Sequence, residues 1–260
     1  MADFWRLIQN ENMKIYRRLR SWVMFGFIVF LPPLISLLIN FAGPGIEITA
    51  WEAMQTESVV LFILITIFTV VIAAEAVAGE FTWGTIKLLL IRPWSRSAIL
   101  LSKYLSTLLF ALFFTVTAFI VTLLVNLAIF GSAGTPAAET SPVADMGTYY
   151  LLKFISLIVI VTFGFMLSSV FRSNGLAIGL SIFLLLSGTI ITNVFSMVDK
   201  AWVKYVIFMH LDLNSYMHGG QGMIPSYPTT LGFSLAVLAG YFILFNLISW
   251  TVFRKRDVTA

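Results

Sequence analysis

Cysteine is absent from this chain of 260 residues, and histidine occurs only twice, as His210 and His218. Without thiols, the chain has no disulfide, no thiolate metal site and no thiol catalysis. The two histidines lie on either side of a polar turn and lack the i, i+4 spacing of a helical metal pair. We therefore predict no resident metal.

Charged residues are also scarce. They make up 11% of the chain, against about 25% in soluble domains, while 59% of the residues are hydrophobic and the mean hydropathy is +0.96. A soluble protein of this composition would expose large apolar patches. The lipid bilayer is the solvent that suits such a chain.

Several catalytic motifs are missing as well. The phosphate-binding pattern GxxxxGK[ST] does not occur, so the chain is not expected to hydrolyse ATP by a P-loop. There is also no GxSxG or HExxH motif, and no Asp lies within the long apolar runs, which argues against an intramembrane protease. The sequence indicates that the chain is not itself an enzyme and carries no cofactor.

Six charge-free apolar runs are long enough to cross a bilayer. They cover residues 22–41, 58–74, 104–130, 154–171, 176–198 and 231–253. A spanning helix needs about 20 residues, with a range of about 17–25. We predict an all-α polytopic membrane protein with six transmembrane helices, built as a single domain over residues 1–260.

Basic residues are distributed unevenly around these runs. If the N-terminus is inside, thirteen of the 16 Lys and Arg residues flank the inner ends, and only Lys153, Lys200 and Lys204 lie on the outer side. This bias follows the positive-inside rule. It predicts a multi-pass membrane protein with both termini in the cytoplasm. The net charge of +4 then reflects topology, and no nucleic acid is expected as a partner.

Two segments outside the runs have apolar character of their own. Residues 1–21 predict an amphipathic helix on the membrane surface, because Phe4, Ile8, Ile15 and Leu19 recur at helical spacing; the alternative is that they lengthen the first span. Residues 199–230 begin with a stretch too short to span, which predicts a re-entrant or interfacial outer segment. Residues 43–57 and 131–148 are expected to be outer loops.

Three residues in or near the spans invite a functional reading. Pro32 and Pro33 remove two backbone donors in the first span and are expected to kink or break it, as a harmless kink or as a hinge in a substrate path. Glu75 either pairs with Lys or Arg at the inner interface or contacts an ion or substrate.

The connection between the second and third runs, residues 80–97, is charged but contains a short apolar stretch. That stretch is too short to span and is expected to pack partly against a protein partner, as a helix in a groove. The residues that make up this candidate site are Glu80, Phe81, Gly84, Thr85, Ile86, Lys87, Leu88, Leu89, Arg92, Pro93 and Arg96.

This connection is similar to a known loop. The pattern Glu80-Phe81-x-x-Gly84-Thr85-Ile86-Lys87-x-Leu89-Leu90, followed by Arg92-Pro93 and Arg96, resembles the loop between the second and third spans of ABC-2 type transporter permeases. Chain length and the number of spans agree, and the likeness is greatest to the small bacterial permeases of the bacitracin-resistance and sodium-efflux groups.

The resemblance implies a function. The chain would be one half of a membrane dimer, with an identical or related second permease, and a cytoplasmic ATPase carrying ATP and Mg would dock beneath each copy. Residues 80–97 would be the coupling helix. Gly84 and Thr85 would shape its turn, Glu80 would hold it through a basic residue, and its anchors would be Ile86, Leu88 and Leu89. Acidic groups on the ATPase or lipid phosphates would be met by Lys87, Arg92 and Arg96. The cargo would be a hydrophobic or peptide-like compound. A membrane scaffold or sensor that transports nothing remains the alternative, as does export of an ion; a secondary transporter ranks third.

Overall fold

The fold is known from a computed structural model that describes residues 2–42, 48–85, 94–131, 141–171, 173–198, 200–220, 222 and 228–255. These residues form α-helices and three short 3-10 helices, and no strand occurs among them. The α-helices are α1 (Ala2–Tyr16), α2 (Leu19–Ala42), α3 (Ala50–Thr82), α5 (Arg96–Phe130), α6 (Pro142–Val170), α7 (Asn174–Ser196) and α8 (Leu231–Lys255).

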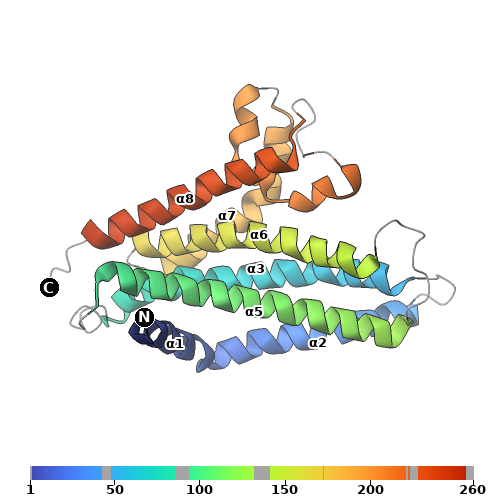
Figure 1. The fold of residues 1–260 in the computed structure, drawn as a ribbon, viewed down its shortest axis with the longest axis horizontal. Coiled ribbons are helices and arrows are strands. Elements are labelled where there is room, and N and C mark those ends of the chain that lie inside the picture. The colour runs from blue at the N-terminus through green and yellow to red at the C-terminus, as the bar shows by residue number, and fades with distance from the viewer. Residues whose placement is uncertain are drawn as a thin grey trace.

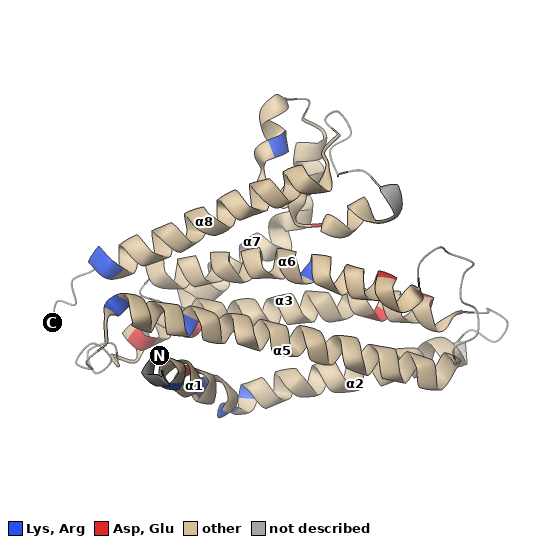
Figure 2. Ribbon diagram, in the orientation of Figure 1, with Lys and Arg blue, Asp and Glu red and all other residues tan. Residues whose placement is uncertain are grey.

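Six of these helices, α2, α3, α5, α6, α7 and α8, are long and apolar enough to cross a membrane. The predicted all-α polytopic architecture with six spans is therefore confirmed. Both chain ends lie at the same end of the bundle (Figure 1). Figure 2 places the basic residues of α1, of the starts of α2 and α5 and of the end of α8 at that end. We call it the basic end.

Helix α3 lies at the centre of the bundle. It contacts α2, α5, α6 and α7, while α8 packs on α6. In the 18-residue apolar stretch that marks each span, 61% of α6 is buried, whereas only 17% of α2 is buried. The exposed side chains of α2, such as Phe30 and Phe41, are apolar, as expected for a helix that faces lipid.

Two helices begin within segments that the sequence analysis assigned to outer loops. Helix α3 starts at Ala50 because Thr49 and Glu52 form a reciprocal capping box. Helix α6 starts at Pro142, where Ser141 accepts a hydrogen bond from the Ala144 amide. The expectation that residues 43–57 and 131–148 are loops is thus wrong for residues 50–57 and 142–148. Glu57, assigned to a loop, lies inside α3 and is fully buried.

The expected break at Pro32 and Pro33 does not occur. Helix α2 is continuous through both prolines. The carbonyls of Ile28 and Val29 still lose their usual helical donors, since proline has no N–H. The hydrogen-bond ladder of α2 is therefore weakened there without being interrupted.

The two partly apolar segments outside the spans, within residues 1–21 and 199–230, pack against the bundle where the structure describes them. Helix α1 is strongly foreshortened in Figure 1, so it runs across the long axis of the bundle, and it buries Leu7 and Ile8 while Trp5 and Met13 stay exposed. Beyond α7, the chain forms η1 (Ala201–Tyr205), η2 (Ile207–His210) and η3 (Leu213–Gly219), which contact α6, α7 and α8. How deeply either segment enters the membrane stays a prediction.

Candidate functional site

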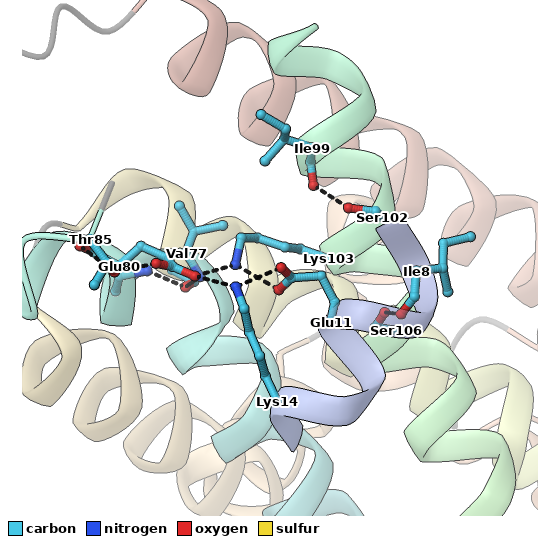
Figure 3. Close-up of polar contacts among 12 residues, drawn as sticks. Ile8, Glu11, Lys14, Val77, Glu80, Thr85, Ile99, Ser102, Lys103 and Ser106 are labelled. Carbon is cyan, nitrogen blue, oxygen red and sulfur yellow. Dashed lines mark hydrogen bonds and ion pairs between the residues drawn. The ribbon is translucent and has the colours of Figure 1, made fainter. Parts of the chain in front are cut away.

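Four charged side chains meet at the basic end, beside the connection between α3 and α5. Glu11 and Lys14 come from α1, Glu80 from the last turn of α3, and Lys103 from the second turn of α5 (Figure 3). We call them the ionic cluster. Three helices that are distant in sequence are thus joined by charge where the connection leaves the bundle.

Lys103 is the centre of the ionic cluster. Its side chain is only 3% exposed, and its Nζ lies 2.8 Å from Glu11 Oε2 and 2.8 Å from Glu80 Oε1. Lys14 Nζ completes the ring, at 2.7 Å from Glu11 Oε1 and 3.1 Å from Glu80 Oε1. Two ammonium groups therefore balance two carboxylates. Such pairing is needed because an unpaired buried charge is strongly destabilising.

The ionisation of the α1 residues is set by these contacts. Burial raises the pKa of Glu11, but the charge of Lys103 and the hydrogen bonds from Lys103 and Lys14 outweigh it, so the pKa lies below its ordinary value. Burial lowers the pKa of Lys14, but Glu11 and Glu80 outweigh it and hold the pKa above its ordinary value. Both side chains are therefore charged at neutral pH.

A second set of polar contacts ties α3 to two more helices, α2 and α7. The Glu75 carboxylate of α3 pairs with Arg20 and with Arg18, whose Nη1 lies 3.0 Å from Glu75 Oε2. Asn174, the first residue of α7, donates from Nδ2 to Glu75 Oε1 at 3.2 Å. Glu75 thus has its basic partners at the basic end of the bundle, and a role as a substrate contact stays a prediction.

The connection itself is held at both ends. On the α3 side, Gly84 has a φ of 67°, in the left-handed region that favours glycine, and Thr85 Oγ1 donates to the Glu80 carboxylate. On the α5 side, Ser95 caps the helix and Arg96 Nη1 donates to the Arg254 carbonyl of α8 at 3.1 Å.

A cavity of about 450 Å³ lies under the α3 end of the connection. Its lining includes the ionic cluster, Arg18, Glu75 and Thr85. Seven of its fifteen lining residues are charged, and they stand beside apolar ones such as Ile15 and Ile72. The cavity therefore offers polar contacts to water, a phosphate group or a polar protein surface.

The structure describes only some of the predicted coupling residues. Glu80, Phe81, Gly84, Thr85 and Arg96 are described, and the first four lie together at the end of α3. Ile86, Lys87, Leu88, Leu89, Arg92 and Pro93 fall outside the described residues, so their predicted roles as anchors and charge contacts stay predictions.

The sequence analysis missed Glu11, Lys14 and Lys103 as site residues. The i, i+3 spacing of Glu11 and Lys14 is a signal for a local ion pair. No local pattern connects either of them with Lys103, which is distant in the chain. Only the packing of α1 on α5 brings these residues together.

Metal binding gains no support at this site. Among the described residues, no group of three or more His, Asp or Glu side chains is placed to hold a metal ion. His210 is used elsewhere: its Nε2 lies 2.8 Å from the Lys204 carbonyl and its Nδ1 lies 2.7 Å from Ser234 Oγ. Burial lowers the pKa of His210, which favours the neutral ring.

Six spanning helices and a charged, basic end define the chain as a multi-pass α-helical membrane protein. It belongs to the family described as protein of unknown function DUF2705, whose profile matches residues 24–259. Two relatives come from Bacillus subtilis (strain 168). The uncharacterized protein YhcI is 42% identical over 97% of this chain and 98% of its own length. The uncharacterized membrane protein YdbK is 30% identical over 95% of this chain and 99% of its own length.

Proposed function

We propose that this chain is the membrane subunit of an ATP-driven exporter whose ATPase is a separate cytoplasmic protein. In this proposal, the protein lies in the cytoplasmic membrane of a bacterium with both termini inside, two copies pair, and residues 80–97 dock on the ATPase. The cargo class is a hydrophobic or peptide-like compound. The observation that carries the proposal is the ionic cluster, which braces the start of the connection.

The lengths of α3 and α5 support the proposal that the connection between them reaches into water. Helix α3 has 33 residues and α5 has 35, so each is about 50 Å long at 1.5 Å per residue. The hydrocarbon core is about 30 Å thick. The two helices therefore extend beyond the core, and the paired charges of Glu75, Glu80 and Lys103 mark the extension at the basic end.

The bracing also supports a mechanical role. A docking segment moves helices only if its attachment is stiffer than its contacts with the partner. Lys103 joins α3 to α1 and α5, Glu75 joins α3 to α2 and α7, and Arg96 joins α5 to α8. A push on the connection would thus reach five of the six spans, α2, α3, α5, α7 and α8, through these contacts. A device of this kind biases the bundle between two states when ATP binds to the partner.

The exporter proposal is tested by replacing Leu88 and Leu89 together with Asp. The tagged protein is purified from its native cells in mild detergent, and ATP-binding chains in the eluate are identified by mass. We expect the double variant to lose the ATPase, because two apolar anchors of the proposed docking segment become charged. The matched control is Val143→Asp, an exposed apolar residue at the other end of the bundle, which should retain the ATPase. Undiminished recovery with the double variant would contradict docking through this segment.

A non-transporting scaffold or sensor is the second candidate. Its support is the group of charged side chains in the cavity lining at the basic end, among them Glu11, Lys14 and Lys103, which could contact a polar protein surface. It predicts that wild-type protein isolates without any ATP-binding chain.

A further inference from the structure

Helix α3 carries a further carboxyl group, that of Glu57, which lies far from the ionic cluster. Glu57 is in the second turn of α3 and its exposure is 0%. Within the described chain, no Lys, Arg or His forms an ion pair with it. A carboxylate without a cation inside a membrane span is costly, and such residues mark functional sites.

Three side chains from three helices form a closed polar ring. Ser36 Oγ of α2 contacts Glu57 Oε1 and lies 3.2 Å from Asn126 Oδ1 of α5. Asn126 Nδ2 lies 2.7 Å from Glu57 Oε2 and 2.9 Å from the Thr122 carbonyl. All three side chains are at most 1% exposed. We call this group the Glu57 ring.

Counting hydrogens shows what the Glu57 ring needs. Ser36 carries one hydroxyl hydrogen, yet its oxygen contacts two acceptor oxygens. If Glu57 is ionised, Ser36 donates to one of them and the other contact has no hydrogen. If Glu57 is protonated, it donates to Ser36, Ser36 donates to Asn126, and Asn126 donates to Glu57. Only the neutral acid closes the ring.

The orientation of the Asn126 amide does not change this result. If its oxygen and nitrogen were exchanged, the amide oxygen would face Glu57 Oε2 at 2.7 Å, and that contact again needs a proton on Glu57. The exchanged amide oxygen would also face the Thr122 carbonyl at 2.9 Å with no hydrogen between them. The orientation with nitrogen toward Glu57 is therefore favoured.

Among the residues that the structure describes, the surroundings of the Glu57 ring offer no charge to stabilise an ionised Glu57. The facing polar groups of α2 and α5 are Ser36, Asn126 and Thr122, none of which is ionisable at neutral pH. Helix α6 contributes Tyr150, whose hydroxyl lies 2.9 Å from Ser58 Oγ and 3.2 Å from Thr122 Oγ1. Tyr149 packs nearby on Phe62, and Glu52 of α3 is exposed at the start of the helix.

We propose that Glu57 is a proton-binding site inside the helical bundle, neutral in the state described by the structure, and that losing the proton loosens α2. The ligand is a proton and not a metal ion, because one atom that faces Glu57 is the donor nitrogen of Asn126. Deprotonation removes the hydrogen needed for the Ser36–Asn126 bond. Helix α2 then keeps a single hydrogen bond to the Glu57 ring, through Ser36. This residue lies one turn beyond Pro32 and Pro33, which weaken the backbone hydrogen bonds of α2.

The proposal does not depend on the exporter proposal, and infrared spectroscopy tests it. The full-length protein is reconstituted in lipid at neutral pH, and the C=O stretching band of protonated carboxylic acids is compared between wild type and Glu57→Gln. We expect wild type to show a band that Glu57→Gln lacks and that fades as the pH is raised. The matched control, Glu75→Gln, should keep the band, because Glu75 is paired with Arg18 and Arg20.

Glu57→Gln should fold, because its amide can donate to Ser36 and accept from Asn126. If it does not, Ser36→Ala provides a second test, since it keeps the acid but removes the hydrogen-bond partner and should shift the band. A wild-type protein without the band, or a band unchanged by both substitutions, would overturn the proposal. Loss of the band on adding Na⁺ or K⁺ at constant pH would identify a metal-cation site and overturn it as well.

Discussion

Helix α3 carries two buried carboxyl regions that solve the same problem in opposite ways. At the basic end, Glu80 is held by Lys103 and Lys14. About 35 Å further along the same helix, Glu57 has only neutral partners in the Glu57 ring. The first region balances charge with charge and sits at the basic end of the bundle. The second lies within the bundle, where we infer that a proton removes the charge.

The comparison links the two proposals physically. A compensated ion cluster is stiff, because each charge has several partners and none can leave without exposing another. A ring that depends on one proton is conditional, because its closure changes with protonation. We therefore expect the basic end to transmit force and the Glu57 ring to respond to its surroundings.

The largest expected effect is that of Lys103→Met. It leaves Glu11 and Glu80 buried with only Lys14 between them, so we expect a loss of about 3–5 kcal/mol in the free energy of unfolding. Heat or denaturant unfolding in detergent, followed by tryptophan fluorescence, measures it. Adding Glu80→Gln should restore part of the loss.

The control for that experiment is Lys153→Met. Lys153 pairs with Asp212 at 2.9 Å, but both side chains are more exposed, at 27% and 43%. An exposed pair contributes about 0–1 kcal/mol. Equal losses for the two lysine variants would contradict the special place of Lys103.

Ser36→Ala is expected to have the next largest effect. It leaves the Glu57 hydroxyl without an acceptor and Asn126 Oδ1 without a donor, which should cost about 1–3 kcal/mol. Ser181→Ala is the matched control, because that buried hydroxyl bonds only the Ala177 carbonyl of its own helix. If both serine variants unfold alike, the Glu57 ring does not contribute as a unit.

The pH dependence of stability should separate the two regions by sign. The pKa of Glu11 is lowered in the folded protein, so its contribution is present above the ordinary value of about 4.3 and is lost as the pH falls. The destabilisation caused by Glu11→Gln should therefore shrink in acid.

Glu57 should behave in the reverse way. The folded protein keeps a proton that the unfolded chain releases above about pH 4.3, so the contribution of Glu57 grows as the pH falls toward that value, by about 1.4 kcal/mol per pH unit. Unfolding of wild type and Glu57→Gln across this range measures the slope. A slope of the same sign for Glu11→Gln and Glu57→Gln would show that the two regions do not differ as we infer.

The smallest expected effect is that of Gly84→Ala. A Cβ at Gly84 meets nothing within 4 Å, so the cost comes only from its φ of 67°, and we expect about 1 kcal/mol. Gly147→Ala in α6 is also free of close neighbours but lacks the positive φ, so it should be neutral or slightly stabilising. Thermal unfolding of the two variants gives the comparison, and equal stability would contradict a strained turn at Gly84.

The sequence was sufficient for the six spans, since each depends on a local run of apolar residues, and for the gathering of basic residues at one end. It was misleading at Glu57, which was placed in a loop because it is charged. The capping box of Thr49 and Glu52 was a readable signal that the helix begins earlier. The partners of Lys103 and Glu57 could not be predicted, because they come from helices whose packing one sequence does not specify.

The central claim, that this chain works with a separate ATPase, is tested most directly by native mass spectrometry of the complex extracted from its own cells in lipid nanodiscs. The proposal predicts a mass equal to two membrane chains plus two copies of an ATP-binding chain, which is identified by peptides that contain a P-loop. Membrane chains alone, in a preparation that retains bound lipid, would contradict it.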